Sequence, residues 1–111
     1  MDINTILHNL INVTPHAVTI CIDGVDHVFP PSGLTIRLKT DTTVIAPGIV
    51  SSKTSVPDLR FDPNAYYFVS GMVAAADLPT GLNVVYPPTD DNYIVRNDKG
   101  HVVKITAVQV K

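Results

Sequence analysis

The chain is predicted to fold as one mainly β domain of the α+β class, either a small antiparallel or mixed sheet or a barrel-like fold. Its 111 residues suit a single domain, residues 1–111, with one modest hydrophobic core. Short segments rich in Val, Ile, Tyr and Phe alternate with turn residues, a pattern typical of strands joined by hairpins. Hydrophobic residues make up 45% and charged residues 16% of the chain, which excludes a disordered tail.

The first regular pattern lies at the N-terminus. Apolar residues recur at helical spacing over residues 3–10, and Asp2 suits the N-cap position. The sequence therefore predicts a short amphipathic helix that opens the chain.

A hairpin is predicted at Asp23-Gly24, because this dipeptide readily adopts the positive φ angles that a two-residue turn requires. The turn would join a strand over residues 17–22 to a second strand over residues 25–29. The Pro-Pro pair that follows ends the second strand, since proline cannot donate a ladder hydrogen bond.

The middle of the chain is predicted to contain a strand over residues 34–39, a short strand over residues 43–45, and a surface loop or extended arm over residues 47–63. Ser, Pro, Asp and Lys are frequent in that last stretch, as is typical of exposed connections. We expect it to act as a lid or to contact a neighbouring subunit.

The C-terminal half is predicted to alternate strand, helix and strand. Residues 66–69 are aromatic and β-branched, as buried strands are, and helix formers follow over residues 71–77. With a further strand over residues 83–86, this order resembles a compressed βαβ crossover. A second hairpin is expected at residues 97–100 (Asn-Asp-Lys-Gly), whose glycine can take the left-handed conformation.

Composition narrows the classes of partner. The net charge is −2 and Lys and Arg are scattered, so duplex nucleic acid is not expected. No apolar run is long enough to span a bilayer, and the first ten residues lack the positive region of a secretory signal. We therefore expect a cytoplasmic protein without membrane contact. The low charge favours a homo-oligomer that buries part of the surface.

Two short polar segments at the edges of apolar strands predict a binding site. In the first, Asn-Val-Thr-Pro-His, Thr14 and His16 offer hydrogen-bond donors and acceptors. In the second, Pro-Pro-Ser-Gly, the amides around Gly33 and the Ser32 hydroxyl can form a concave anion site. The simpler alternatives are a capped strand start and an ordinary rigid turn.

Three further residues complete the candidate ligand-binding set. Arg37 could hold a phosphate or carboxylate through two parallel hydrogen bonds. Ser70 precedes the predicted helix, where free amides favour negative charge, and the ring of Tyr67 or Tyr66 could stack on a base. A solvated arginine and a plain N-cap serine are the simpler alternatives.

The sequence contains none of the common catalytic or metal-binding motifs. HExxH, a Walker loop, Gly-x-Ser-x-Gly and zinc-type Cys/His spacing are all absent, so we expect neither a metal nor a cofactor. An enzyme is less expected than a binding protein, although a small hydrolase or cyclase-like enzyme with His16 as general base stays open. The single cysteine, Cys21, excludes an intramolecular disulfide and suits a small strand residue.

The order of these motifs resembles a family of small proteins of tailed phages, prophages and bacteria. Its members look like Asn-Leu-Thr-Pro-His near the start, then Pro-Pro-Ser-Gly with a following Arg, a Tyr-x-Val-Ser strand and a closing Val-Arg-Asp-x-x-Gly hairpin. The similar segments here are residues 12–16, 30–37, 67–70 and 95–100. The chain departs from the family pattern at Val13, where Leu is commoner, and at Gly71, where Ala is usual; both differences concern packing.

The resemblance implies a phage setting, which leads to two function hypotheses. In the first, the protein captures an anionic, nucleotide-type host signalling ligand in the host cell cytoplasm, and so acts as a sponge that blunts host defence. In the second, it is a structural or host-protein-binding accessory protein without a small-molecule ligand, which acts through a sheet edge.

Overall fold

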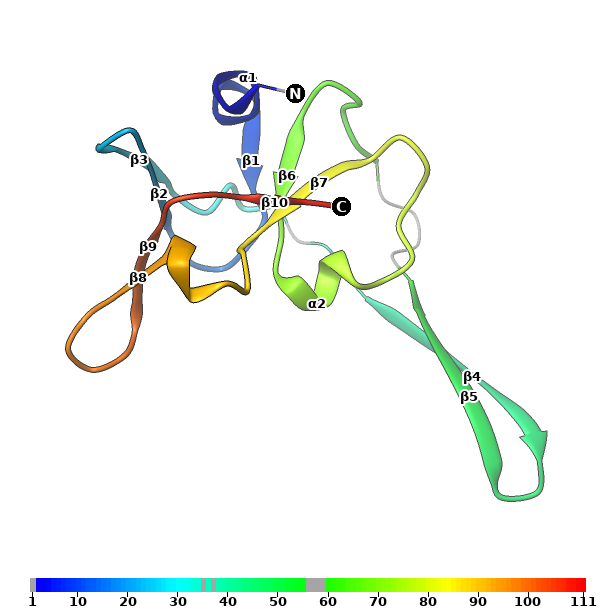
Figure 1. Cartoon of the computed structure of the whole chain (residues 1–111). Helices are drawn as coiled ribbons and strands as arrows, with labels where there is room; N and C mark the ends of the chain where they lie inside the picture. The colour runs from blue at the N-terminus through cyan, green and yellow to red at the C-terminus, as the bar shows by residue number, and fades with distance from the viewer. Residues whose placement is uncertain (1, 35, 37, 56–59) are drawn as a thin grey trace.

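The computed structural model describes residues 2–34, 36, 38–55 and 60–111, and within this part the strands form three small sheets (Figure 1). Two four-stranded sheets build the body of the molecule, and a two-stranded sheet protrudes from it. The predicted mainly β fold with short helices is confirmed. In the described part, no helix has the length and apolar character needed to cross a membrane.

The first sheet is mixed and has the strand order β1-β6-β7-β10. Its strands are β1 (Leu10–Asn12), β6 (Tyr66–Phe68), β7 (Asn83–Tyr86) and β10 (Gln109–Val110). The first three run parallel, and β10 pairs antiparallel with β7. Helix α1 (Ile3–His8) leads into β1, and the Asp2 side chain caps it by accepting a hydrogen bond from the Asn4 amide at 3.1 Å. The predicted opening helix is therefore confirmed.

A compressed βαβ unit connects two strands of this sheet. Strands β6 and β7 pair in parallel, and α2 (Gly71–Ala74) lies between them in the chain. The helix is shorter than the predicted range of 71–77. The amide of Asp77 donates to the carbonyl of Thr54 at 3.0 Å, so the chain leaves the helix to pair with a strand that sequence periodicity does not reveal.

The second sheet contains both predicted hairpins and has the order β3-β2-β9-β8. Its strands are β2 (Val18–Ile22), β3 (Val25–Phe29), β8 (Ile94–Arg96) and β9 (Val102–Ile105). Asp23 and Gly24 have φ angles of 51° and 79°, and Gly100 has φ 80°, so all three adopt the left-handed conformation that these turns need. After β9 the chain leaves this sheet and enters the first sheet as β10.

The core occupies both faces of the first sheet. On one face, Phe68 and Val85 pack with Ile6 of α1 and with Ile20 and Ile105 of the second sheet. On the other face, the alternating residues of the same strands pack against α2; this cluster comprises Ala65, Tyr67, Val69, Ala74 and Val84. The short parallel strands are mainly apolar because both faces of the sheet are covered.

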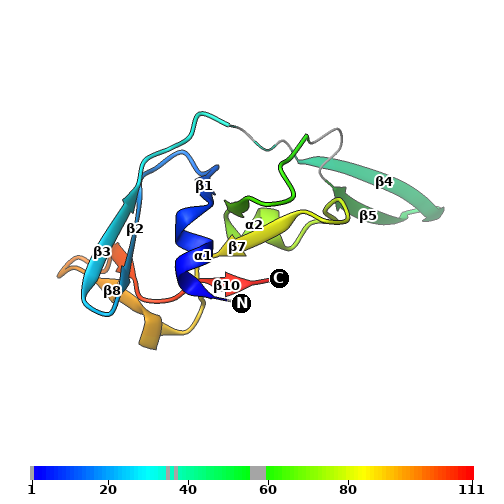
Figure 2. The same ribbon diagram turned by 90° about the horizontal axis from the view of Figure 1, so that it is seen from above.

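The third sheet is an arm that extends from the body (Figures 1 and 2). It consists of β4 (Lys39–Ala46) and β5 (Ile49–Ser55), joined by a turn in which Gly48 has φ 78°. Residues 47–63, expected to be a loop or extended arm, thus contain a regular strand. The predicted strand over 34–39 is wrong for the described residues 34, 36 and 38, since strand pairing begins only at Lys39.

Candidate functional site

The two polar segments that the sequence singles out lie side by side. The Ser32 amide donates to the Asn12 carbonyl at 2.9 Å, and the Val13 amide donates to the Phe68 carbonyl at 3.0 Å. These contacts bring the corner after β1, the Pro-Pro-Ser-Gly turn and the end of β6 to one place. The two polar segments are therefore adjacent in the fold.

A hollow of about 390 Å³ opens at this convergence. Three of the predicted site residues line it: Thr14, Gly33 and Ser70. Among the described residues, the rest of the lining is apolar and consists of Val13, Pro15, Pro31, Leu34, Ile36, Val69 and Val73. The hollow is thus mainly apolar, with two hydroxyl groups at its wall.

Asn12 organises the corner, and sequence reasoning missed it as a functional position. Its side chain is only 2% exposed. Its amide nitrogen donates to the carbonyls of His16 at 2.8 Å and Phe29 at 2.9 Å, while its oxygen accepts from the amide of Thr14 at 2.9 Å. A signal was available, since Asn commonly closes a turn by bonding the backbone two residues further on.

The polar groups at the corner are already bonded to one another. The Thr14 hydroxyl lies 2.6 Å from the Asn12 side-chain oxygen and 3.0 Å from the His16 carbonyl. The Ser32 hydroxyl oxygen accepts from the Leu34 amide at 3.2 Å. Two of the amides expected to hold an anion, those of Ser32 and Leu34, therefore have protein partners. This arrangement favours the simpler alternative of a capped strand and a rigid turn.

The remaining predicted site residues lie outside the hollow or outside the described part of the chain. His16 is exposed, and it is its backbone carbonyl that bonds the corner. Tyr67 is 3% exposed and its hydroxyl accepts from the Asp62 amide at 2.8 Å, so its ring cannot stack on a base while the core stays closed. Tyr66 is half-buried and packs against the first core cluster. Arg37 lies outside the described residues.

Ser70 has a structural role that the sequence allowed. Its hydroxyl accepts a hydrogen bond from the Val73 amide at 3.3 Å and caps helix α2. This is the N-cap alternative considered from the sequence. The same side chain still forms part of the wall of the hollow.

The ion pairs of the described residues involve none of the residues that line the hollow. A hydrogen bond from the Lys53 ammonium, 2.8 Å away, lowers the pKa of Asp77 at the base of the arm. A hydrogen bond from the Cys21 thiol and a second from Lys104 lower the pKa of Asp26 on β3. None of the described residues that line the hollow is charged. Over the described ranges, no group of three His, Cys, Asp or Glu side chains is placed to hold a metal ion.

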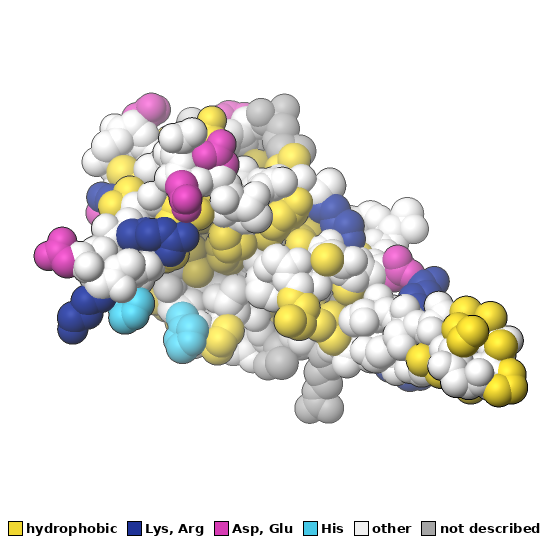
Figure 3. Space-filling model, turned by 60° about the horizontal axis from the view of Figure 1, so that its bottom comes forward, with side chains coloured by type: hydrophobic (Ala, Val, Ile, Leu, Met, Phe, Trp, Pro, Cys, Tyr) yellow, Lys and Arg dark blue, Asp and Glu magenta, His cyan; other side chains and the backbone are white. Residues whose placement is uncertain are grey.

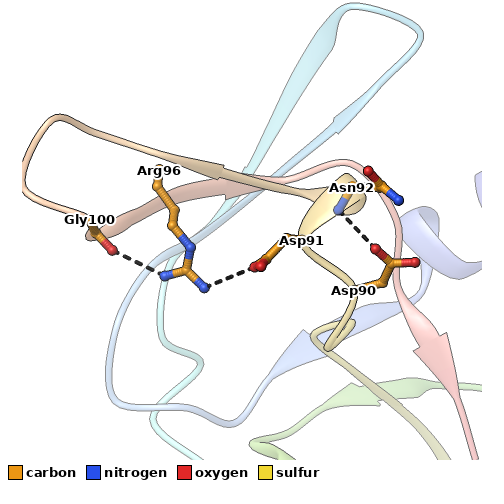
Figure 4. A network of polar contacts seen from close by, with 5 residues as sticks. All are labelled: Asp90, Asp91, Asn92, Arg96 and Gly100. Atoms are coloured by element: carbon orange, nitrogen blue, oxygen red, sulfur yellow. Dashed lines mark hydrogen bonds and ion pairs between the residues drawn. The ribbon is translucent and has the colours of Figure 1, made fainter.

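The closing hairpin contains a second polar network, drawn in Figure 4. The Arg96 guanidinium donates to the Gly100 carbonyl at 3.1 Å and to the carboxylate of Asp91 in the short helix η1 (Asp91–Tyr93) at 3.5 Å. The Asp90 carboxylate caps η1 by accepting from the Asn92 amide at 2.9 Å. These contacts stabilise the hairpin and the short helix η1 that precedes it, so the Val-Arg-Asn segment has a local structural role.

Comparisons of this chain with protein-family models, with curated proteins and with solved structures found no match in any of the three. The resemblance to small phage and bacterial proteins therefore stays a prediction.

Proposed function

We propose that this protein is a non-enzymatic interaction module. It holds an apolar protein segment in the hollow between helix α2 and the corner at residues 12–16, here called the Asn12 corner. The observation that carries the proposal is the contrast inside this site. The lining is mainly apolar, while the hydroxyl and amide groups around it already bond one another. Of the two functions expected from the sequence, this is the structural or protein-binding one.

An apolar occupant suits the hollow for energetic reasons. An anion buried there needs donors or a cation to replace the water that it loses. The Ser32 and Leu34 amides are no longer free to supply those bonds. An apolar side chain needs no such partner, and its transfer out of water is itself favourable. The volume of about 390 Å³ falls within the usual range of binding cavities.

The exposed arm is a second feature that supports an interaction role. The molecule measures 55 Å in its longest dimension and only 25 Å in its shortest. Four large apolar side chains at the end of the arm stand more than half exposed: Val44, Ile45, Ile49 and Val50. Small soluble domains rarely extend such an element into water unless it meets a partner.

The test uses the full chain with isotope-labelled methyl groups and follows NMR shifts on titration. N-acetyl-isoleucine amide, an uncharged probe, should give saturable shifts at the methyls of Val13, Val69 and Val73. Leu34→Asp places a charge at the hollow and should abolish these shifts, whereas Val25→Asp adds the same charge at an exposed position of β3 and should preserve them. Saturation confined to any other part of the molecule would contradict the proposal.

A second candidate function is the capture of an anionic, nucleotide-type ligand, which keeps the anti-defence hypothesis. It is favoured by one observation: Thr14, Gly33 and Ser70 line the same hollow, as a ligand site built from these residues requires. Native mass spectrometry with cyclic and linear nucleotides tests it. Binding that is lost in the His16→Ala, Arg37→Ala double variant, with the fold intact, would favour this candidate over an apolar occupant.

A further inference from the structure

The tip of the β4–β5 arm presents a cluster of large apolar side chains to solvent, here called the arm tip. Its members are Val44, Ile45, Ile49 and Val50, which are 70%, 66%, 56% and 58% exposed. Figure 3 shows hydrophobic side chains gathered at the end of the arm. A contiguous exposed apolar cluster of this kind typically marks a site of association.

The arm tip and the hollow lie at opposite ends of one element. Ile36 lines the hollow, and β4 begins three residues later at Lys39. The eight residues of β4 then span about 25 Å at the usual rise of a strand. The base is held to the body by the Lys53–Asp77 ion pair at 2.8 Å. In this structure the arm tip therefore lies well away from the hollow of its own chain (Figure 1).

We propose that the arm tip of one copy of this chain docks into the hollow of a second copy. This inference rests on the proposed function and names the protein segment that the hollow holds. The tip is convex and apolar, and the hollow is concave and mainly apolar. No charged group of the arm tip or of the described lining loses its water in the contact, which avoids the desolvation that opposes the burial of ions.

The distribution of charge on the arm supports a second copy as the occupant. One face of the ribbon carries Lys39, Asp41 and Lys53, in register across the two strands. The opposite face carries no charge; its members are Thr40, Thr42 and Val44 on β4, paired with Thr54, Ser52 and Val50 on β5. An uncharged surface thus runs from the base of the arm to its tip.

The hydroxyl groups of the uncharged face hydrogen-bond each other across the two strands. The hydroxyls of Thr40 and Thr54 are 3.2 Å apart, and those of Thr42 and Ser52 are 3.0 Å apart. Because each hydroxyl already shares one hydrogen bond, covering this face costs less than covering unpaired hydroxyls. An isolated two-stranded ribbon is marginal in water, so a second copy that covers this one would also stabilise it.

The first experiment measures self-association of the full chain by sedimentation velocity over a wide concentration range. We expect the unmodified protein to self-associate, and Ile45→Asp at the tip and Leu34→Asp at the hollow each to weaken association at least about tenfold. Thr43→Asp adds the same charge on the face of β4 that carries Lys39 and Asp41, and it should associate like the unmodified protein. Val73→Asp serves as a second hollow variant if Leu34→Asp does not fold.

The decisive experiment mixes the two defective variants. The Ile45→Asp copy keeps an intact hollow, and the Leu34→Asp copy keeps an intact tip. Each should be monomeric alone, and together they should form a one-to-one heterodimer. If the mixture stays monomeric, or if Leu34→Asp associates as well as the unmodified protein, the tip does not enter the hollow and the inference is overturned.

The same materials separate this inference from the function on which it depends. If the protein remains monomeric while N-acetyl-isoleucine amide still shifts the methyls of Val69 and Val73, the hollow binds an apolar segment from another protein. In that case the docking of a second copy is wrong and the proposed function stands. If the probe gives no shifts at the hollow, the proposed function itself fails.

Discussion

The Asn12 corner and the arm tip are both turns beside a strand, yet the corner buries a polar side chain while the tip exposes apolar ones. At the corner, a buried amide side chain bonds two carbonyls and a backbone amide of neighbouring segments. At the arm tip, four large apolar side chains stand in solvent. The corner uses a polar group to build the interior, while the tip places apolar groups outside.

The difference separates residues that hold the fold from residues that are free for function. Over the described residues, no buried side-chain nitrogen or oxygen lacks a hydrogen-bond partner, so the polar groups of the body are explained by folding. The exposure of the arm tip is not explained in this way. Its side chains contribute little to folding in a single chain, and the arm tip and the hollow are the places where the proposed interaction would occur.

The largest expected effect comes from the same truncation made in the core of the body and at the arm tip. Ile20 is fully buried in β2, and Ile45 is 66% exposed. Ile20→Ala should lower the free energy of unfolding by about 3–4 kcal/mol, because it leaves a cavity in the core. Ile45→Ala should change it by no more than about 0.5 kcal/mol. Urea unfolding at low protein concentration measures both, and equal losses would remove the contrast between the regions.

The second effect tests the corner directly. Asn12→Ala should cost about 3 kcal/mol, because the His16 and Phe29 carbonyls and the Thr14 amide lose their buried partner. Asn12→Asp keeps an acceptor for Thr14 but places a buried carboxylate against the His16 and Phe29 carbonyls, so it should cost at least as much. Urea unfolding measures both variants; a cost below about 1 kcal/mol for Asn12→Ala would mean that water replaces the side chain.

The third effect compares two glycines with the same backbone conformation. Gly24 and Gly48 have φ angles of 79° and 78°, and an added Cβ at either position would meet no atom within 4 Å. Alanine at each should therefore cost about 1–2 kcal/mol of local conformational energy. Gly24→Ala should lower the global stability, since its hairpin supports the core. Gly48→Ala should raise hydrogen exchange only in β4 and β5, because the arm opens by itself.

The smallest effect concerns pH at the base of the arm. Lys53 lowers the pKa of Asp77, so the pair stabilises the folded arm above the ordinary aspartate pKa of about 3.9. That contribution is lost as the pH falls through the lower folded pKa. The pKa of Lys53 is raised in turn, so the pair is also lost as the pH rises through that value.

Hydrogen exchange of the Asp77 amide, corrected for its intrinsic pH dependence, measures this change. The amide bonds the Thr54 carbonyl and so reports on the arm base. Exchange should increase in acid, and Asp77→Asn should remove the acid transition. If Asp77→Asn leaves the acid transition unchanged, the transition belongs to another titrating group. The expected effect is small because both members of the pair are well exposed and screened by solvent.

The parts of the fold that follow from local chemistry were predictable from the sequence. The turn at Asp23-Gly24 and the hairpin over residues 97–100 follow from residues that tolerate positive φ. Helix α1 follows from the Asp2 cap and the apolar spacing after it. Each of these elements is decided within a few residues, so no distant contact is needed to predict it.

Tertiary structure alone decided the rest. Strand β5 has no buried face and hence no hydrophobic alternation, so only its pairing with β4 reveals it. The chemistry of the hollow was settled in the same way: Asn12 binds Thr14, the turn amides find partners, and Tyr67 enters the core. The sequence located two polar segments that lie side by side, but long-range pairing and burial determined which of their groups remain free, because a hydrogen bond made inside the fold is no longer available to a ligand.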